Sequence, residues 1–499
     1  MRDDFRSHRL LIGTLILTAS GIFSRVLGFF YRIFLSRRIG AEGLGIYQMI
    51  FPVYGICFSL CAGSLQTAIS RFTAADRAHA GRTLLSGLFL SLSLSLAFAG
   101  LILHFSQPIA VYILREPRCA PLLSIMALAF PCISVNACIS GYYYGKELVA
   151  IPAVSQLVEQ CIRIFAVWFT ACILISRERP VTVQLAVIGL AAGEAASALF
   201  TALSYFILHG IPTVGRVREL YPVMISLTSM ALPLMATRLV MNLLQSAETI
   251  LIPGRLSLFG LTHTQSVSIY GVLTGMAMPF ILFPSAIVNS LAVVLLPNIA
   301  RQQSCGNQPA ISRRVSMSLR YSLYMGILCV GIFAVFGETL GLQVFKNRDA
   351  GTFISILSWL CPFLYLATTM GSILNGLGKT NTTFLHHIAA MLLRLAFVFF
   401  GIPRFGIRAF LWGMLAGELL LALLHYISLL RLVSFSRNVW ENLIKPIACI
   451  LAALGIFRLL PGFSTPSGGM AALFITLLKI TFVCSCYLLF LLLLHKESS

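Results

Sequence analysis

The sequence predicts an all-α polytopic membrane protein of about 14 transmembrane helices, built as two six-helix lobes in a parallel pseudo-twofold repeat plus two C-terminal helices. Hydrophobic residues make up 58% of the 499 residues and charged residues only 10%, whereas soluble domains carry about 25% charged residues. Mean hydropathy is +0.91. Apolar runs approaching the roughly 20 residues that cross a bilayer recur from end to end. A transmembrane β-barrel would instead show alternating segments of ~10 residues.

Short polar breaks divide the chain into the predicted spans. The first span follows a basic start that is also typical of a signal peptide, but its apolar run continues to Phe34 and is too long for a cleaved segment. We therefore predict a retained first helix. The predicted spans are 10–36, 44–70, 83–105, 121–144, 152–176, 183–209, 223–250, 265–296, 319–345, 353–376, 381–400, 406–431, 440–460 and 470–494.

The distribution of basic residues predicts the orientation of the chain. An even number of spans places both termini on one side, and more Lys and Arg residues fall on that side than on the other. The positive-inside rule then predicts that both termini are cytoplasmic, in a multi-pass protein of the cell membrane. Most of the net charge of +20 lies in loops, where it favours contact with anionic membrane lipids. It does not indicate nucleic-acid binding.

Short motifs of the first half return in the second half in the same order. SRVL at 24–27 returns as TRLV at 237–240, and GLAAGE at 189–194 returns as GMLAGE at 413–418. Between these, IFP returns as LFP, and a Gly-Lys pair is repeated. Transporters are often built from such repeats, with a cavity between the halves. The predicted domains are an N-lobe at 1–215, a C-lobe at 216–432 and an appendage at 433–499.

Two arginines of the first span, Arg25 and Arg32, lie seven residues apart and therefore on one helix face. A central arginine costs roughly 3 kcal/mol on insertion scales, so its presence calls for a use. Arg238 is the counterpart in the seventh span. Snorkelling to the interface is one interpretation, above all for Arg32. An ion pair with Glu159, Glu194 or Glu248 is a second. A wet cavity that binds an anion is a third, because guanidinium groups suit phosphate and carboxylate.

The seventh span continues this pattern with three further polar residues, Asn242, Gln245 and Glu248, spaced along one face. A polar stripe on a membrane helix faces either a cavity or a partner helix. With Arg25, Arg32 and Arg238, we predict these residues as the substrate-binding set.

Buried acids and histidines form a second set of candidates. Glu194 and Glu418 each end a G-x-x-x-G pattern, which allows close helix packing. Each carboxylate either pairs with an arginine of the preceding span or couples transport to a proton or Na⁺. His386 and His387 either titrate or are packed. The candidates for ion coupling or structural pairing are Glu159, Arg163, Glu194, His387, Arg394 and Glu418.

Enzyme signatures are missing from the sequence. It has no P-loop, no H-E-x-x-H and no G-x-S-x-G motif, and its loops are too short for a catalytic domain. The 13 cysteines fall mostly inside apolar runs, which favours buried apolar side chains over a metal site or disulfides. We predict no enzymatic activity, no cofactor and no metal site.

Three stretches resemble a known family. SRVLGFFYRIFLSRRIGAEGLGIYQMIFPVYG at 24–55 resembles the opening of the stage V sporulation protein B family, part of the MATE-like (multidrug/oligosaccharidyl-lipid/polysaccharide) flippase superfamily. ALPLMATRLVMNLLQSAETILIPGRL at 231–256 and YGVLTGMAMPFILFPSAIVNSLAVVLLPNIA at 270–300 are similar to its seventh and eighth helices. The similarity extends over nearly the whole chain.

The resemblance implies a flippase that moves an undecaprenyl-pyrophosphate-linked glycan of the lipid II type by alternating access, for spore cortex, peptidoglycan or polysaccharide synthesis. It implies that Arg25, on the S-R-x-L-G motif, lines a cationic cavity, and that the last two helices hold the lipid tail. Arg32 departs from the pattern of the related lipid II flippases, whose arginine stands one residue earlier and precedes an acid. The rivals are a cation-coupled multidrug antiporter and a non-transporting scaffold that recruits a glycan polymerase.

Overall fold

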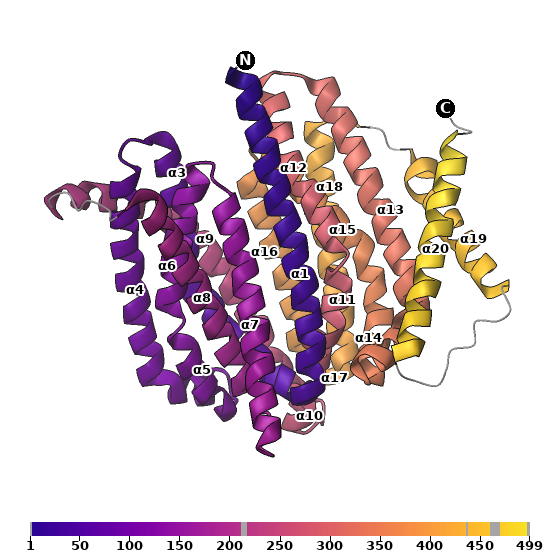
Figure 1. The fold of residues 1–499 in the computed structure, drawn as a ribbon. Helices are drawn as coiled ribbons and strands as arrows, with labels where there is room; N and C mark the ends of the chain where they lie inside the picture. The colour runs from indigo at the N-terminus through magenta and orange to yellow at the C-terminus, as the bar shows by residue number, and fades with distance from the viewer. Residues whose placement is uncertain (1, 211–216, 436–437, 460–469, 497–499) are drawn as a thin grey trace. The chain divides into compact units, whose positions relative to one another are not determined.

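The computed structural model describes residues 2–210, 217–435, 438–459 and 470–496, and in these ranges it contains helices and no strands (Figure 1). Over the same residues, 12 helices are long and apolar enough to cross a bilayer, or 13 with the bent pair Pro117–Ala127 and Phe130–Gly145 counted as one span. The first, Ile16–Ala75, has 60 residues, about three times the roughly 20 that one crossing needs. It is interrupted at Gly40, where φ is 71°, and holds two of the predicted spans. The predicted all-helical membrane class is confirmed.

The chain forms two compact units, Met1–Gly254 and Arg255–Ser499. The first unit thus takes in most of α9, which the sequence assigns to the C-lobe. The domain boundaries at 215 and 432 stay predictions. The helices of the first unit are α1 (Arg2–Met49), α2 (Phe51–Phe58), α3 (Ser64–Ala75), α4 (Ala80–Pro108), α5 (Ala120–Ala127), α6 (Phe130–Gly145), α7 (Ala150–Ser176), α8 (Gln184–His209) and α9 (Val217–Leu258), with the π-helical turn η1 (Ser59–Gly63) joining α2 to α3.

In the first unit α4, α6, α8, α7 and α1 lie in a row, each in contact with the next (Figure 1). Small residues allow α6 to approach α3 closely. A Cβ atom on Gly141 would lie 2.6 Å from the carbonyl oxygen of Gln66, and one on Gly145 would lie 2.6 Å from that of Ser70. Because backbone atoms cannot move aside as a side chain can, both positions require glycine.

A leucine at Gly141 is therefore expected to separate α3 from α6 and to lower the thermal midpoint Tm of the purified protein by several degrees. Overpacking of a dense interior costs typically 1–3 kcal/mol. Gly100 on α4 is the matched control, because a Cβ atom there has open space around it. Gly100→Leu should leave Tm within about a degree of the wild type, as measured by thermal unfolding in detergent. Equal effects of the two changes would contradict this account of the α3–α6 contact.

The second unit is built around α13, which packs against α14, α15, α19 and α20 (Figure 1). Gly351 of α14 meets the backbone of Glu338 on α13, where a Cβ atom would lie 2.6 Å from its Cα atom. The helices of this unit are α10 (His263–Gly271), α11 (Met278–Leu282), α12 (Ser285–Ser304), α13 (Gln308–Leu340), α14 (Arg348–Leu357), α15 (Cys361–Gly376), α16 (Thr380–Ala396), α17 (Ile402–Phe405), α18 (Ile407–Leu432), α19 (Lys445–Leu459) and α20 (Met470–Lys496).

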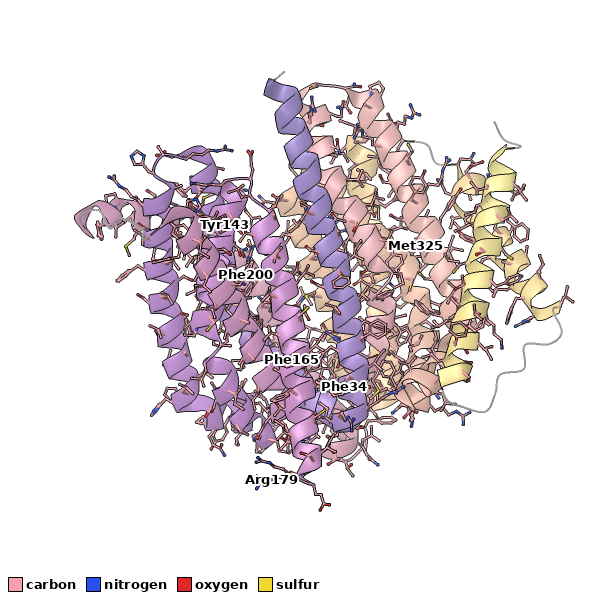
Figure 2. The ribbon with its side chains drawn as sticks, viewed as in Figure 1. Phe34, Tyr143, Phe165, Arg179, Phe200 and Met325 are labelled. Atoms are coloured by element: carbon pink, nitrogen blue, oxygen red, sulfur yellow. The ribbon has the colours of Figure 1, made fainter. Side chains whose placement is uncertain are left out.

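Large apolar side chains cover much of the outer surface of the helices. Phe165 of α7 is 56% exposed (Figure 2), and many leucines, phenylalanines and tryptophans of both units are similarly exposed. A soluble monomer rarely exposes apolar patches larger than a few hundred Å², whereas lipid chains are an apolar solvent for such residues. The chain is a multi-pass membrane protein.

Candidate functional site

A buried ionic cluster joins three helices of the first unit. The guanidinium Nη2 of Arg163 contacts Glu159 Oε1, one turn earlier on α7, and lies 3.8 Å from Glu194 Oε1 on α8. The hydroxyl of Tyr54 on α2 donates a hydrogen bond of 3.2 Å to the same Glu194 oxygen. The predicted partners Arg163 and Glu194 thus lie together, with Glu159 as a second carboxylate. Two acids share one base.

The G-x-x-x-G motif on α8 makes this arrangement possible. A Cβ atom on Gly193 would lie 2.8 Å from the carbonyl oxygen of Glu159, and one on Gly189 would lie 3.2 Å from that of Arg163 and collide with Val167. Glycine at both positions lets α8 lie against α7 with almost no side chain between them. This close approach places the Glu194 carboxylate, which follows Gly193 directly, beside Arg163.

The ionic cluster lines a polar pocket of about 440 Å³ inside the first unit. Among its lining residues, Ser155 of α7 donates a 3.1 Å hydrogen bond to the Asn136 side-chain oxygen on α6. A pocket of this composition within membrane-spanning helices suits a polar ligand or a cation. Its polar lining consists of Tyr54, Gln66, Asn136, Ser140, Tyr144, Ser155, Gln156, Glu159, Arg163 and Glu194.

Polar residues of α9 contact the α2–α3 segment of the same unit. Arg238 Nη2 donates a 3.2 Å hydrogen bond to Thr67 Oγ1 on α3. Asn242 Nδ2 donates to the carbonyl oxygen of Gly55 at 3.1 Å and to Ser59 Oγ at 2.5 Å. The π-helical turn η1 begins at Ser59, and such turns often lie at functional sites.

Gln245 and Glu248, the other two residues of the predicted polar stripe on α9, have different surroundings. Gln245 is exposed, and Glu248 is buried at 6% exposure. Arg238 and Asn242 therefore act together in the structure, whereas Gln245 and Glu248 do not share their surroundings.

The two arginines of α1 have different environments. Arg32 is partly buried and lies close enough to Tyr47 and Arg163 to interact electrostatically with both. Arg25 is exposed and has no acidic partner among the described residues. Glu159 and Glu194, which the sequence leaves open as partners of Arg25, are instead engaged by Arg163.

Like Arg25, Arg238 has no acidic partner among the described residues. Its guanidinium donates a hydrogen bond to the Thr67 hydroxyl. Among the arginines within the spans, Arg163 and Arg394 are paired with glutamates, whereas Arg25 and Arg238 keep an uncompensated charge over the described part of the chain. An anion is the natural complement of such groups.

The second unit contains the repeat counterpart of the ionic cluster. Arg394 Nη1 of α16 lies 4.0 Å from Glu418 Oε1 of α18. A Cβ atom on Gly417 would lie 2.5 Å from Arg394 Cγ, so the second G-x-x-x-G motif also brings helices together. The structure thus places both predicted Arg–Glu pairs side by side.

Three histidines cluster on the same two helices, α16 and α18, as this second pair. The ring of His425 on α18 lies 5.0 Å from that of His386 and 5.7 Å from that of His387, both on α16. His425 Nδ1 lies 2.8 Å from the Leu421 carbonyl oxygen, which makes Nδ1 the protonated nitrogen. His425 is fully buried, and its Nε2 has no hydrogen-bond partner among the described residues.

Several of these residues were not singled out from the sequence. Tyr54, Ser59 and Thr67 gave no signal, because a lone hydroxyl in an apolar run is common. His425 gave a weak signal, since it lies seven residues after Glu418 and so on the same helix face. Within the described ranges, no group of three or more His, Cys, Asp or Glu side chains is arranged to hold a metal ion.

The chain matches known proteins over most of its length. Residues 10–303 match the model of the polysaccharide biosynthesis protein family. Stage V sporulation protein B of Bacillus subtilis is 28% identical over 86% of this chain and 85% of its own length. The lipid II flippase MurJ of the same organism is 22% identical over 78% of this chain and 76% of its own.

A solved structure shares the fold. The inward closed conformation of lipid II flippase MurJ superposes with a TM-score of 0.75 at 14% identity, covering 97% of this chain and 99% of that one. Because the family model spans more than half of the residues, the chain belongs to the polysaccharide biosynthesis protein family, and it shares the fold of the lipid II flippase MurJ.

Proposed function

We propose that this protein moves an undecaprenyl-pyrophosphate-linked glycan precursor of the lipid II type from the cytoplasmic to the outer leaflet by alternating access. The observation that carries the proposal is the uncompensated charge of Arg25 and Arg238. A guanidinium group within the membrane that lacks an acidic partner offers its planar fork to phosphate. The names of the relatives, a sporulation protein and a lipid II flippase, support this class of cargo.

In this proposal the arginines hold the diphosphate, so that the glycan crosses without entering hydrocarbon. Asn242 and Arg238 are fixed by hydrogen bonds to the α2–α3 segment, which reduces the entropy lost when an anion binds. Both termini lie in the cytoplasm, and the headgroup enters from that side. The substrate's lipid tail remains in the bilayer throughout.

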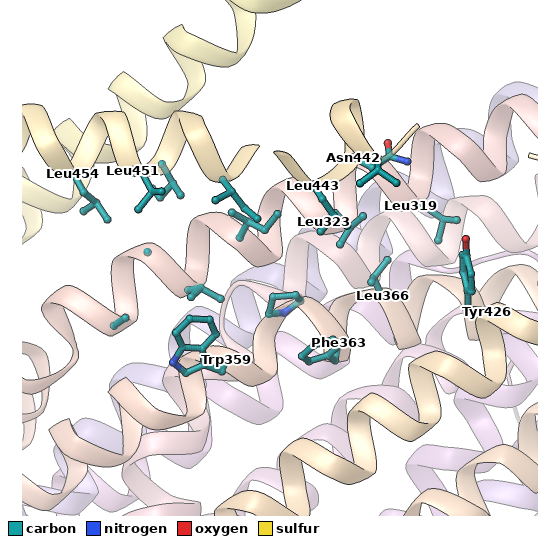
Figure 3. Close-up of a pocket in the computed structure, with 18 of the residues that line it drawn as sticks. Leu319, Leu323, Trp359, Phe363, Leu366, Tyr426, Asn442, Leu443, Leu451 and Leu454 are labelled. Carbon is teal, nitrogen blue, oxygen red and sulfur yellow. The ribbon is translucent and has the colours of Figure 1, made fainter. Parts of the chain in front are cut away.

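An apolar pocket of about 1000 Å³ in the second unit supports a tail site next to α19 (Figure 3). Leu451 and Leu454 of α19 face Leu323 of α13 and Trp359 across it. Leu and Trp side chains offer a polyprenyl chain a largely apolar surface. This pocket fits the tail-binding role expected for the appendage at 433–499.

The test is depletion of this protein from cells followed by extraction of lipid-linked precursors. Loss of the flippase should cause the undecaprenyl-pyrophosphate glycan to accumulate in the cytoplasmic leaflet, while the glycan polymerase runs short of substrate. Accessibility of the precursor to an added outside enzyme distinguishes the leaflets. Normal wall synthesis, with no precursor building up inside, would refute the proposal.

The ionic cluster favours a second candidate function, a cation-coupled antiporter. Glu159 and Glu194 together outnumber Arg163, so a proton or Na⁺ could balance the pocket's charge. In that case depleted cells would retain drugs and build up no glycan precursor. The third possibility, a scaffold that recruits a glycan polymerase, is distinguished by mutation. A scaffold would keep its function when Arg25 and Arg238 are both replaced.

A further inference from the structure

A cationic cluster in the second unit is formed by Arg320 and Lys445. Arg320 Nη1 of α13 lies 3.5 Å from Glu441 Oε2, and Lys445 Nζ lies 3.7 Å from Glu441 Oε1. Lys445 is the first residue of α19, and its side chain is only 4% exposed. Two bases therefore share one acid, which leaves the cluster with one positive charge.

The cluster has many more hydrogen-bond donors than acceptors. A guanidinium carries five N–H donors and an ammonium three, and the contacts to Glu441 are longer than the 2.7–2.9 Å of a charge-assisted hydrogen bond. Neither the Arg320 nor the Lys445 side chain has a hydrogen bond to any described residue, and Arg320 Nε is buried without one. Buried donors are normally hydrogen-bonded, and an anion with several oxygens offers acceptors to both side chains.

Two tyrosines hold the cluster in place. The Tyr324 hydroxyl on α13 donates a 3.0 Å hydrogen bond to the Glu441 carbonyl oxygen. The Tyr487 hydroxyl on α20 donates one of 3.0 Å to the Tyr324 carbonyl oxygen. α13, α20 and the segment before α19 are thereby fixed to one another, so the geometry of the cations is set before any ligand arrives.

Arg320 lies at the depth of lipid headgroups. The 20 residues that follow it, 321–340, are largely apolar and rise about 30 Å, enough to cross the hydrocarbon core. The part of α13 that precedes Arg320 includes Arg313 and Arg314, which are suited to the polar side of the interface. Arg320 therefore marks the boundary at which lipid phosphates lie.

Arg320 and Lys445 line a pocket of about 610 Å³ whose remaining wall is mainly apolar. The charged end and the apolar wall together match an amphiphile with a phosphate head and a hydrocarbon chain. The apolar wall is made by Ile287, Val288 and Leu291 of α12, Met325 and Leu328 of α13, and Leu488, Leu491 and Leu492 of α20.

We infer that this pocket binds an anionic glycerophospholipid, with its phosphodiester on Arg320 and Lys445 and an acyl chain along α12 and α20. Charge complementarity selects this occupant. The cluster carries one net positive charge, and phosphatidylglycerol carries one negative charge, whereas a polyprenyl diphosphate glycan carries more. The site is distinct from Arg25 and Arg238, and does not depend on the transported cargo.

The experiment measures phosphatidylglycerol binding to the purified full-length chain in detergent, by native mass spectrometry and by the rise in Tm on lipid addition. Phosphatidylglycerol should bind, and phosphatidylcholine with the same acyl chains should bind at least about tenfold more weakly, since it lacks the net charge. Inorganic phosphate alone should give no rise in Tm, because it cannot use the apolar wall. A rise with inorganic phosphate equal to that with the lipid would overturn the lipid assignment.

Variants locate the binding. Arg320→Gln is expected to weaken phosphatidylglycerol binding about tenfold or more, while Arg313→Gln, an exposed arginine of the same helix, should leave it unchanged. Leu491→Trp fills the pocket from its apolar wall and retains both cations. It should also weaken binding about tenfold or more. This second variant keeps the test valid if Arg320→Gln fails to fold. Equal binding to all four proteins would overturn the inference. Tighter binding of undecaprenyl diphosphate than of phosphatidylglycerol, lost in the same variants, would reassign the pocket to the carrier lipid.

Discussion

Replacing Arg25 or Arg238 by alanine is expected to abolish precursor translocation while leaving the protein folded. Hydrogen bonds to charged groups contribute roughly 1.5–3 kcal/mol each, so losing one guanidinium fork should reduce the rate about a hundredfold or more. Stability should change little, because Arg25 is exposed and neither arginine has a described acidic partner to strand. The measurements are accumulation of the lipid-linked precursor in cells that carry only the variant, and Tm of the purified variant.

Matched substitutions separate charge from position. Arg25→Lys keeps the charge and loses the fork, and should retain partial activity. Arg179→Ala removes an exposed arginine just beyond the end of α7 (Figure 2) and should be neutral. Normal translocation by Arg25→Ala would contradict the proposal. If activity and the amount of folded protein fell together, Arg25 would be needed for folding and not for binding the cargo.

The sequence predicts the membrane class and much of the helix order because lipid demands long apolar runs, which are a local property. It also offers both Arg–Glu pairs as one of two interpretations of the buried glutamates. In each repeat a G-x-x-x-G motif precedes a glutamate, and the arginine lies in the preceding span, so one packing rule brings the two side chains together. The helix interruption at Gly40 is also local, because glycine adopts a φ of 71° without strain.

The sequence could not predict which side chains contact each other across helices. Glu159, Glu194 and Glu248 were all open as partners of Arg25, and the sequence does not choose between Arg25 and Arg163 as their partner. The structure pairs Glu159 and Glu194 with Arg163. The contact of Arg238 with Thr67 joins residues 171 positions apart, and it depends on how α9 lies against α3. The histidine cluster depends in the same way on the packing of α18 against α16.

Arg163→Ala is expected to destabilise the first unit strongly. The side chains of Arg163, Glu159 and Glu194 are between 7% and 17% exposed, and breaking a buried ion pair by removing one partner costs about 3–5 kcal/mol. The cost arises because two carboxylates would remain side by side in the pocket without a cation. A loss of this size should lower Tm by roughly 10 °C, measured by thermal unfolding in detergent.

The cause can be isolated by removing the stranded charges as well. Arg163→Ala combined with Glu159→Gln and Glu194→Gln should regain most of the lost Tm, because neutral amides need no counter-charge and still offer hydrogen bonds to Tyr54. Arg394→Ala in the second unit should cost less, since Arg394 faces Glu418 at 4.0 Å and these two side chains are more exposed than those of Arg163 and Glu194. Should the triple variant be no more stable than Arg163→Ala, the role of Arg163 would be packing between α7 and α8. The same comparison applied to Arg25 gives the opposite expectation, loss of transport at constant Tm, and this contrast separates the arginines that stabilise the fold from those available to an anionic ligand.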